Sequence, residues 1–385
     1  MQTIEIQAGS AKWPLLFDAQ RLLTPLQKPA TNTTPPREQV AYALERPLRF
    51  EALRRALTPD DHICVVLDER LPHLAELIAG VMDHLATAGI DPDAVTLLSP
   101  NPESKQAWLE ELPDELSDVK TAIHTPNEPK KLAYLATTKS DHRVYLSRVA
   151  VEAEFVIVLT AHRFDGRTGE RLLCPGIADA ETQAATLTDT DVSEVCWLLG
   201  TPFFVRVIEG RGDSVETVIG GFAETLKDAD AARDALWATA VNTLADLVIA
   251  TVPEAGASFE DLAVAVTAAA NAVKPGGKIV LSTAANPPRP EAFSVLNESR
   301  DADSMRKKLR KHKVAGWESA LAWLDATTQA PLFVSAEWPA EQVETLLATP
   351  LVSASELQRL MDGEGTLIVI EDAHRAKVLV KNATS

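Results

Sequence analysis

The side chains best suited to chemistry gather in one loop after a short apolar run at residues 155–159. His162 can act as a general acid or base, because the unperturbed pKa of histidine lies near neutrality. Three arginines of the same loop could hold a carboxylate or a phosphate through paired hydrogen bonds: Arg163, Arg167 and Arg171. A charged surface loop with an incidental histidine is an equally good reading of these residues.

A second polar segment follows the apolar run at residues 63–67. It contains Asp68 and Arg70, and Arg70 could clamp a substrate carboxylate. Alternatively, the two side chains simply form the polar entry to the next helix. The basic stretch at 306–313 is read as a solvated helix face or loop rather than a binding site.

Several common active-site motifs are missing from the chain. No Gly-x-Gly-x-x-Gly or phosphate-loop pattern is found, which argues against a nicotinamide dehydrogenase and a nucleotide hydrolase. No Gly-x-Ser-x-Gly elbow indicates a serine hydrolase. The three cysteines have no metal-type spacing, and their odd number does not suggest a disulfide framework.

The elements around these loops predict an α/β fold. Residues 63–67 are apolar throughout, which is typical of a parallel strand covered on both faces. A helix over 74–88 and a strand over 94–98 complete a βαβ unit, and a hairpin is expected at 203–219. A helix over 259–273 repeats the pattern. We therefore expect two α/β domains with mainly parallel sheets, residues 1–235 and 236–385, and a ligand cleft between them.

Composition limits the partners of the protein. The 385 residues carry 37 basic and 55 acidic side chains, a formal charge of −18, which repels nucleic acid. No apolar run is long enough to span a bilayer, and the first residues do not resemble a signal peptide. We expect a cytoplasmic protein whose partner is a small anionic molecule, with no nucleic acid and no membrane. The sequence leaves the oligomeric state open.

The order of the segments over 37–285 resembles the nickel-dependent lactate racemase family. The resemblance rests on His124-Thr125-Pro126, on the loop from His162 to Pro175-Gly176-Ile177-Ala178, and on the turn at 273–277. It implies a racemase or epimerase of 2-hydroxy acids that uses a nickel-pincer nucleotide. In that family two histidines act as acid and base, a lysine attaches the cofactor, and a further histidine binds nickel.

The resemblance assigns roles to five residues of this chain. His162 matches a catalytic histidine, Arg70 and Arg163 would bind the substrate carboxylate, and Arg167 and Arg171 would bind the cofactor.

Other family positions differ. Arg171 occupies the place of the attachment lysine, and a guanidinium cannot form the thioamide link. The second catalytic histidine is expected where the chain reads Ser99-Pro100-Asn101-Pro102, and residues 183–191 contain no histidine for nickel. No residue is assigned as a metal ligand, so the cofactor is implied by the family, and a protein without it is the alternative.

Three functions fit these observations. The first is a 2-hydroxy-acid racemase or epimerase that binds the cofactor non-covalently. The second is a non-catalytic protein that binds a small anion on the same scaffold. The third is a different enzyme that uses His162, Asp165 and Glu170 in new roles.

Overall fold

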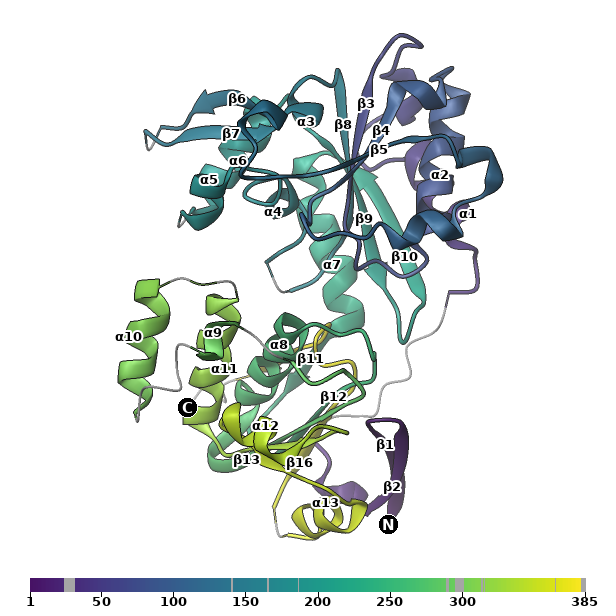
Figure 1. Cartoon of the computed structure of the whole chain (residues 1–385). Helices are drawn as coiled ribbons and strands as arrows, with labels where there is room; N and C mark the ends of the chain where they lie inside the picture. The colour runs from purple at the N-terminus through teal and green to yellow at the C-terminus, as the bar shows by residue number, and fades with distance from the viewer. Residues whose placement is uncertain are drawn as a thin grey trace. The chain divides into compact units, whose positions relative to one another are not determined.

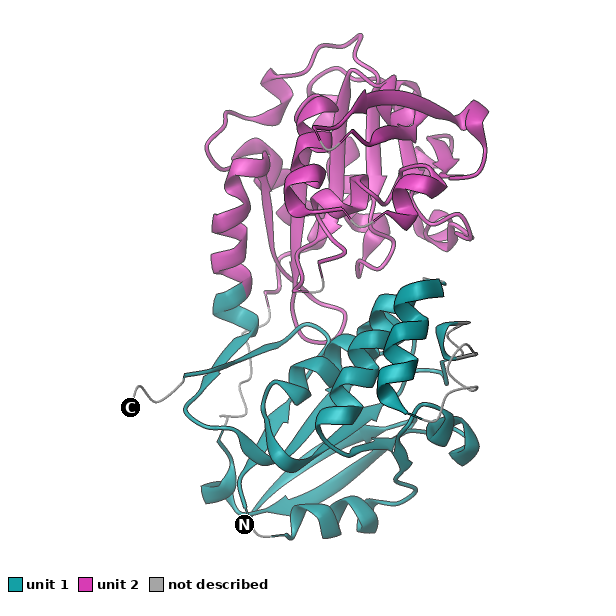
Figure 2. Ribbon diagram, turned by 90° about the vertical axis from the view of Figure 1, so that its left-hand side faces the viewer, with its two compact units in different colours: residues 1–28, 234–385 teal, residues 29–233 magenta. Residues whose placement is uncertain are grey.

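A computed structural model describes most of the chain and divides it into two compact units (Figure 2). Unit 2 comprises Pro29–Arg233, and unit 1 combines Met1–Lys28 with Asp234–Ser385. The described residues are 1–23, 32–139, 141–164, 166–185, 187–288, 291–294, 301–312, 314, 316–363 and 365–381.

Unit 2 is built on a six-stranded sheet with the order β10-β9-β8-β3-β4-β5 (Figure 1). All neighbouring pairs are parallel except β9 and β10, which form an antiparallel hairpin. The strands are β3 (Ile63–Leu67), β4 (Val95–Ser99), β5 (Lys120–Ile123), β8 (Phe155–Ala161), β9 (Phe203–Glu209) and β10 (Val215–Gly221).

Both faces of this sheet are covered, which explains why β3 and the first five residues of β8 are apolar throughout. Alternate residues of β3, such as Val65, pack with α1 (Pro36–Glu45) and α2 (Leu74–Thr87). The intervening residues, such as Val66, pack against three short helices on the other face. These are α3 (Arg148–Val151), α4 (Glu170–Leu173) and α6 (Asp189–Leu198).

A smaller lobe of unit 2 consists of a two-stranded antiparallel sheet and its helices. Strand β6 (Leu132–Thr137) pairs with β7 (Arg143–Ser147), and α5 (Ala180–Ala184) follows α4. Val144 and Leu146 anchor this sheet in a small apolar core that it shares with α6. The 3-10 turns of the unit are η2 (Leu53–Arg55), η3 (Pro92–Ala94), η4 (Ala107–Glu111), η5 (Asp114–Leu116), η6 (Pro129–Lys131) and η7 (Ala223–Thr225).

Unit 1 contains a parallel sheet with the order β15-β14-β13-β12-β16. Its strands are β12 (Ala245–Val252), β13 (Val273–Thr283), β14 (Leu332–Ser335), β15 (Thr349–Pro350) and β16 (Leu367–Ile370). Its helices are α8 (Phe259–Ala270), α9 (Glu291–Ser294), α10 (Ala302–His312), α11 (Trp317–Gln329), α12 (Ala340–Thr345) and α13 (Ala354–Met361). Helices α8 and α11 bury the fully enclosed Trp323 against one face of the sheet.

The hairpin β1 (Gln2–Ala8) and β2 (Ala11–Phe17) covers the other face of the unit 1 sheet. Ile4 and Ile6 pack there with Ile249 of β12 and Val280 of β13. The 3-10 turn η1 (Ala19–Arg21) follows the hairpin.

The α/β class with mainly parallel sheets is confirmed, but the division of the chain differs from the sequence expectation. The first 28 residues belong to the C-terminal unit, because the apolar face of the β1–β2 hairpin is buried on its sheet. The expected boundary at 235/236 lies close to the observed division after Arg233, inside α7 (Leu226–Trp237). The ligand cleft expected between the domains stays a prediction.

Helix α7 ends at Trp237, and the next residues, Ala238–Val241, form β11, which pairs with β17 (Lys377–Val380). One local expectation differs. The turn at 273–277 lies within β13, with Gly276 at φ +78. In the described part of the chain, no helix is both long and apolar enough to cross a membrane.

Candidate functional site

His162 follows the last residue of β8, at the carboxyl end of the unit 2 sheet. Its backbone N–H donates to the carbonyl of Val207 on β9 (2.8 Å), which extends the pairing of the two strands by one residue. Thr160 lies opposite Arg206 in the register of β8 and β9. Because side chains alternate along a strand, Thr160, His162 and Arg206 share one face of the sheet.

The imidazole of His162 is buried and has a carboxylate partner. Nε2 lies 3.1 Å from Oδ1 of Asp230 on α7, and the residue is only 7% exposed. Burial is the main cause that lowers the pKa of His162 to about 4. Arg233 lowers this pKa further, whereas Asp230 opposes the shift. The ring is therefore neutral at pH 7.

The Asp230 contact also fixes which nitrogen carries the proton. A neutral imidazole beside a carboxylate donates its N–H, so Nε2 is protonated and Nδ1 keeps a lone pair. Among the residues that the structure describes, no other hydrogen bond to the ring is found. Nδ1 is thus available to accept a hydrogen bond or a proton.

Helix α7 supplies the residues around His162 that sequence reasoning missed. Arg233 forms an ion pair with Asp230 (3.0 Å), and its guanidinium lies 3.9 Å from the ring centre of Phe164. It also donates to the carbonyl of Arg163 (3.3 Å). Asp230 stands 68 residues from His162, and no local motif connects the two positions.

The two arginines expected to bind a substrate carboxylate already contact carboxylates of the chain. Arg163 donates from Nε and Nη2 to Glu209 (2.6 and 2.7 Å), and both side chains are almost fully buried. Burial disfavours the charged form of Arg163, but Glu209 outweighs it and raises the pKa of the guanidinium. Arg70 makes the same two-point contact with Asp68 (2.9 and 3.1 Å). Their role in ligand binding stays a prediction.

The arginines expected to bind the cofactor lie farther along the loop. Arg171 on α4 donates to Asp189 (2.6 Å), whose side chain is almost fully exposed. Arg167, which lies between His162 and α4 in the sequence, is half-buried. Asp165, considered for the third function, lies outside the described residues, and Glu170 accepts a hydrogen bond from Ser193 (2.7 Å).

A network of hydrogen bonds occupies the position after β4 where the family has its second histidine. Oε1 of Glu69 accepts hydrogen bonds from three side chains: Ser99 (3.0 Å), Ser104 (2.6 Å) and Trp108 (2.8 Å). A carboxylate at this place could orient a histidine. The carboxylate of Glu69 instead links the loop after β4 to the loop after β3. Residues 99–102 contain no histidine.

The donor set does not fit the nickel-pincer nucleotide. Arg171, at the place of the attachment lysine, is a protonated guanidinium paired with Asp189, and it cannot form the covalent link. Residues 183–191 lack an imidazole or thiolate. Within the described residues, no group of three or more His, Cys, Asp or Glu side chains is arranged to hold a metal ion.

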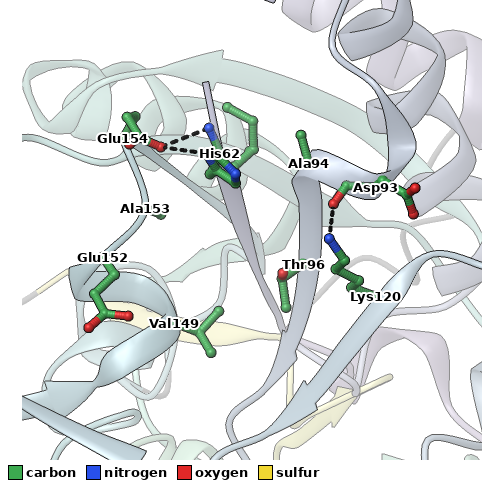
Figure 3. A pocket seen from close by; sticks show the side chains of 10 residues that line it. His62, Asp93, Ala94, Thr96, Lys120, Val149, Glu152, Ala153 and Glu154 are labelled. Atoms are coloured by element: carbon green, nitrogen blue, oxygen red, sulfur yellow. Dashed lines mark hydrogen bonds and ion pairs between the residues drawn. The ribbon is translucent and has the colours of Figure 1, made fainter. Parts of the chain in front are cut away.

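A hollow of about 380 Å³ lies in unit 2 away from His162 (Figure 3). It opens at the amino ends of the strands, whereas His162 follows the carboxyl end of β8. His62 contacts Glu154 across one wall (3.2 Å), and Lys120 donates to the carbonyl of Asp93 on the other. None of the candidate site residues lines it. The lining residues are His62, Ile63, Asp93, Ala94, Thr96, Lys120, Val149, Glu152, Ala153 and Glu154.

Comparisons with known proteins found one family model and similar solved structures. The model of the lactate racemase N-terminal domain matches residues 9–186. The lactate racemase apoprotein from Thermoanaerobacterium thermosaccharolyticum has a similar structure, with a TM-score of 0.82 and 17% identity over 98% of this chain and 100% of that one. A structural-genomics protein from Thermotoga maritima is also similar, with a TM-score of 0.64 and 12% identity over 90% and 98% of the chains. No curated protein sequence matches the chain.

Proposed function

Through its N-terminal half the chain belongs to the lactate racemase family, and from that premise we propose that it binds a small 2-hydroxy acid beside His162 without nickel-dependent racemisation. The observation that carries this proposal is the buried imidazole of His162, whose Nε2 lies 3.1 Å from Oδ1 of Asp230. Its free Nδ1 can accept a hydrogen bond from the hydroxyl group of such an acid.

The proposal keeps the binding of a 2-hydroxy acid but not the nickel-dependent racemisation of the family. The chemistry that the nickel-pincer nucleotide supplies in the family is hydride transfer at the α-carbon of the acid. The residues that anchor that group are replaced in this chain, so no reaction step through it is assigned. We assign the family's substrate class to this chain because the chain has the family's fold and a histidine at His162. This inference is one of analogy.

Calorimetric titration with L-lactate and with propionate, which lacks the hydroxyl group, tests the proposal. We expect lactate to bind about tenfold more tightly, since one satisfied hydrogen bond to a buried acceptor is worth about 1–1.5 kcal/mol. His162→Phe should remove the difference between the two acids. Equal affinity of the wild-type protein for both acids, or no binding of either, would contradict the proposal.

The racemase itself is the second candidate, and the His162–Asp230 pair favours it, because a base needs a group that orients it. It predicts nickel in protein produced together with the enzymes that make the cofactor. It also predicts exchange of the α-hydrogen of lactate, lost in His162→Ala. Nickel-free protein that leaves stereopure lactate unchanged would exclude this candidate.

A further inference from the structure

Arg206 is a buried cation in the middle of β9. The residue is 1% exposed, and its guanidinium lies 4.5 Å from the ring centre of Phe204, two residues earlier on the same face of the sheet. Within the part of the chain that the structure describes, its hydrogen bonds go to two neutral oxygens, the hydroxyl of Thr225 (3.0 Å) and the carbonyl of Gly221 (3.4 Å). The buried Nε–H has no hydrogen-bond partner among the described residues.

Arg163 provides an internal comparison for Arg206. Both arginines are buried in unit 2, but Arg163 has a two-point contact with a buried carboxylate. No carboxylate of the described chain lies within ion-pair distance of Arg206. Three carboxylates act on Arg206 from longer range: Glu170, Asp230 and Glu224. Two of them have other partners, since Asp230 is bound by His162 and Arg233, and Glu170 by Ser193.

Burying a charge without a counterion is unfavourable, so a buried cation normally has an anionic partner. Burial also lowers the pKa of Arg206 to about 10, which leaves the guanidinium charged at neutral pH. A free positive charge and an unused N–H donor are the two features that a carboxylate oxygen satisfies. The missing counterion can therefore come from a ligand.

We propose that Arg206 binds the carboxylate of a small organic acid, with Thr160 and His162 lining the same site. His162 stands two residues beyond the position opposite Arg206, and strand spacing and rise place their Cβ atoms roughly 8 Å apart on one face. An acid with a hydroxyl next to its carboxylate can reach both side chains. This proposal rests on the proposed function. It places the carboxylate of the acid at Arg206 rather than at Arg70 or Arg163.

The test compares Arg206→Met with Arg54→Met. Arg54 lies in the same unit but is only partly buried and is paired with Glu45 (2.9 Å), so its removal controls for the lost charge. Melting temperature is measured against rising concentrations of L-lactate, acetate and chloride at constant ionic strength. We expect a saturable increase with lactate and acetate for the wild type and Arg54→Met. Affinity should fall at least tenfold in Arg206→Met.

A second measurement does not depend on how the variant folds. In wild-type protein labelled with ¹⁵N-arginine, the Nε–H signal of Arg206 should shift on addition of acetate, in step with the change in melting temperature. Arg206→Lys, which keeps the charge, should bind more weakly than the wild type and more tightly than Arg206→Met.

The outcomes separate the two proposals. Saturable lactate binding that persists unchanged in Arg206→Met overturns the role of Arg206 and leaves the proposed function standing. Acetate binding that depends on Arg206, without a preference for lactate over propionate, supports the carboxylate site and overturns the proposed function. An unshifted Arg206 signal and no saturable effect of any anion overturn both.

Discussion

At the scale of single residues, His162 links the stability of unit 2 to pH. Its pKa is about 4 in the folded protein and near 6.5 in the unfolded chain, so the unfolded chain binds the proton more tightly. This contribution is fully present above pH 6.5 and is lost as the pH falls towards 4. Between pH 7.5 and 5 we expect a loss of about 2 kcal/mol that is missing in His162→Gln. Urea unfolding at the two pH values measures it, and identical pH dependence in both proteins would contradict the buried neutral ring.

The buried Arg163–Glu209 pair makes a second residue-scale prediction. Glu209→Gln leaves a buried guanidinium without its counterion, and we expect a cost of about 3 kcal/mol or more in the free energy of unfolding. The double variant Arg163→Met/Glu209→Leu removes both charges and should recover most of that loss. If the double variant is less stable than the single one, the pair is not an isolated electrostatic unit.

At the scale of elements, the β1–β2 hairpin stabilises unit 1 through its buried face. Ile6 is 1% exposed, so Ile6→Ala should cost about 2–4 kcal/mol. Glu5→Ala, on the exposed face of the same strand, should change stability by less than about 0.5 kcal/mol. Amide hydrogen exchange in β12 and β13 measures both effects. Equal exchange rates in the two variants would mean that the hairpin does not stabilise the sheet.

Elements with a strong local pattern could be predicted from the sequence. Strand β3 and the first five residues of β8 are apolar throughout, and α2 shows helical spacing in the sequence after β3. Strand β5 was missed because it lies at the edge of the sheet and its four residues are half-buried or exposed. The docking of the β1–β2 hairpin was missed because it depends on contacts with residues more than 200 positions away.

The candidate site was predicted only in part for the same reason. The loop with His162 could be recognised because its residues are contiguous. Its partners Asp230 and Glu209 could not, because they stand 68 and 46 residues from the side chains that they contact. Arg206 gave no sequence signal, since a single arginine in a strand is common on exposed faces, and only the fold shows that this face is covered.

At the scale of the whole molecule, the two units differ in whether one continuous fragment can fold alone. Unit 2 is continuous in sequence, so a fragment of residues 29–233 should fold alone and unfold cooperatively. A fragment of residues 234–385 lacks the hairpin that covers its sheet and should be soluble and folded only when residues 1–28 are supplied. Circular dichroism and urea unfolding check this. Cooperative unfolding of 234–385 on its own would contradict the division.

The neutral imidazole with a free Nδ1 is the feature on which the functional account depends, and ¹⁵N NMR of histidine-labelled protein observes it directly. At pH 7 we expect Nε2 of His162 to carry the proton and Nδ1 to be unprotonated, and we expect the Nδ1 signal to shift on addition of L-lactate. A protonated ring at pH 7, a proton on Nδ1, or a signal that lactate leaves unchanged would contradict the account.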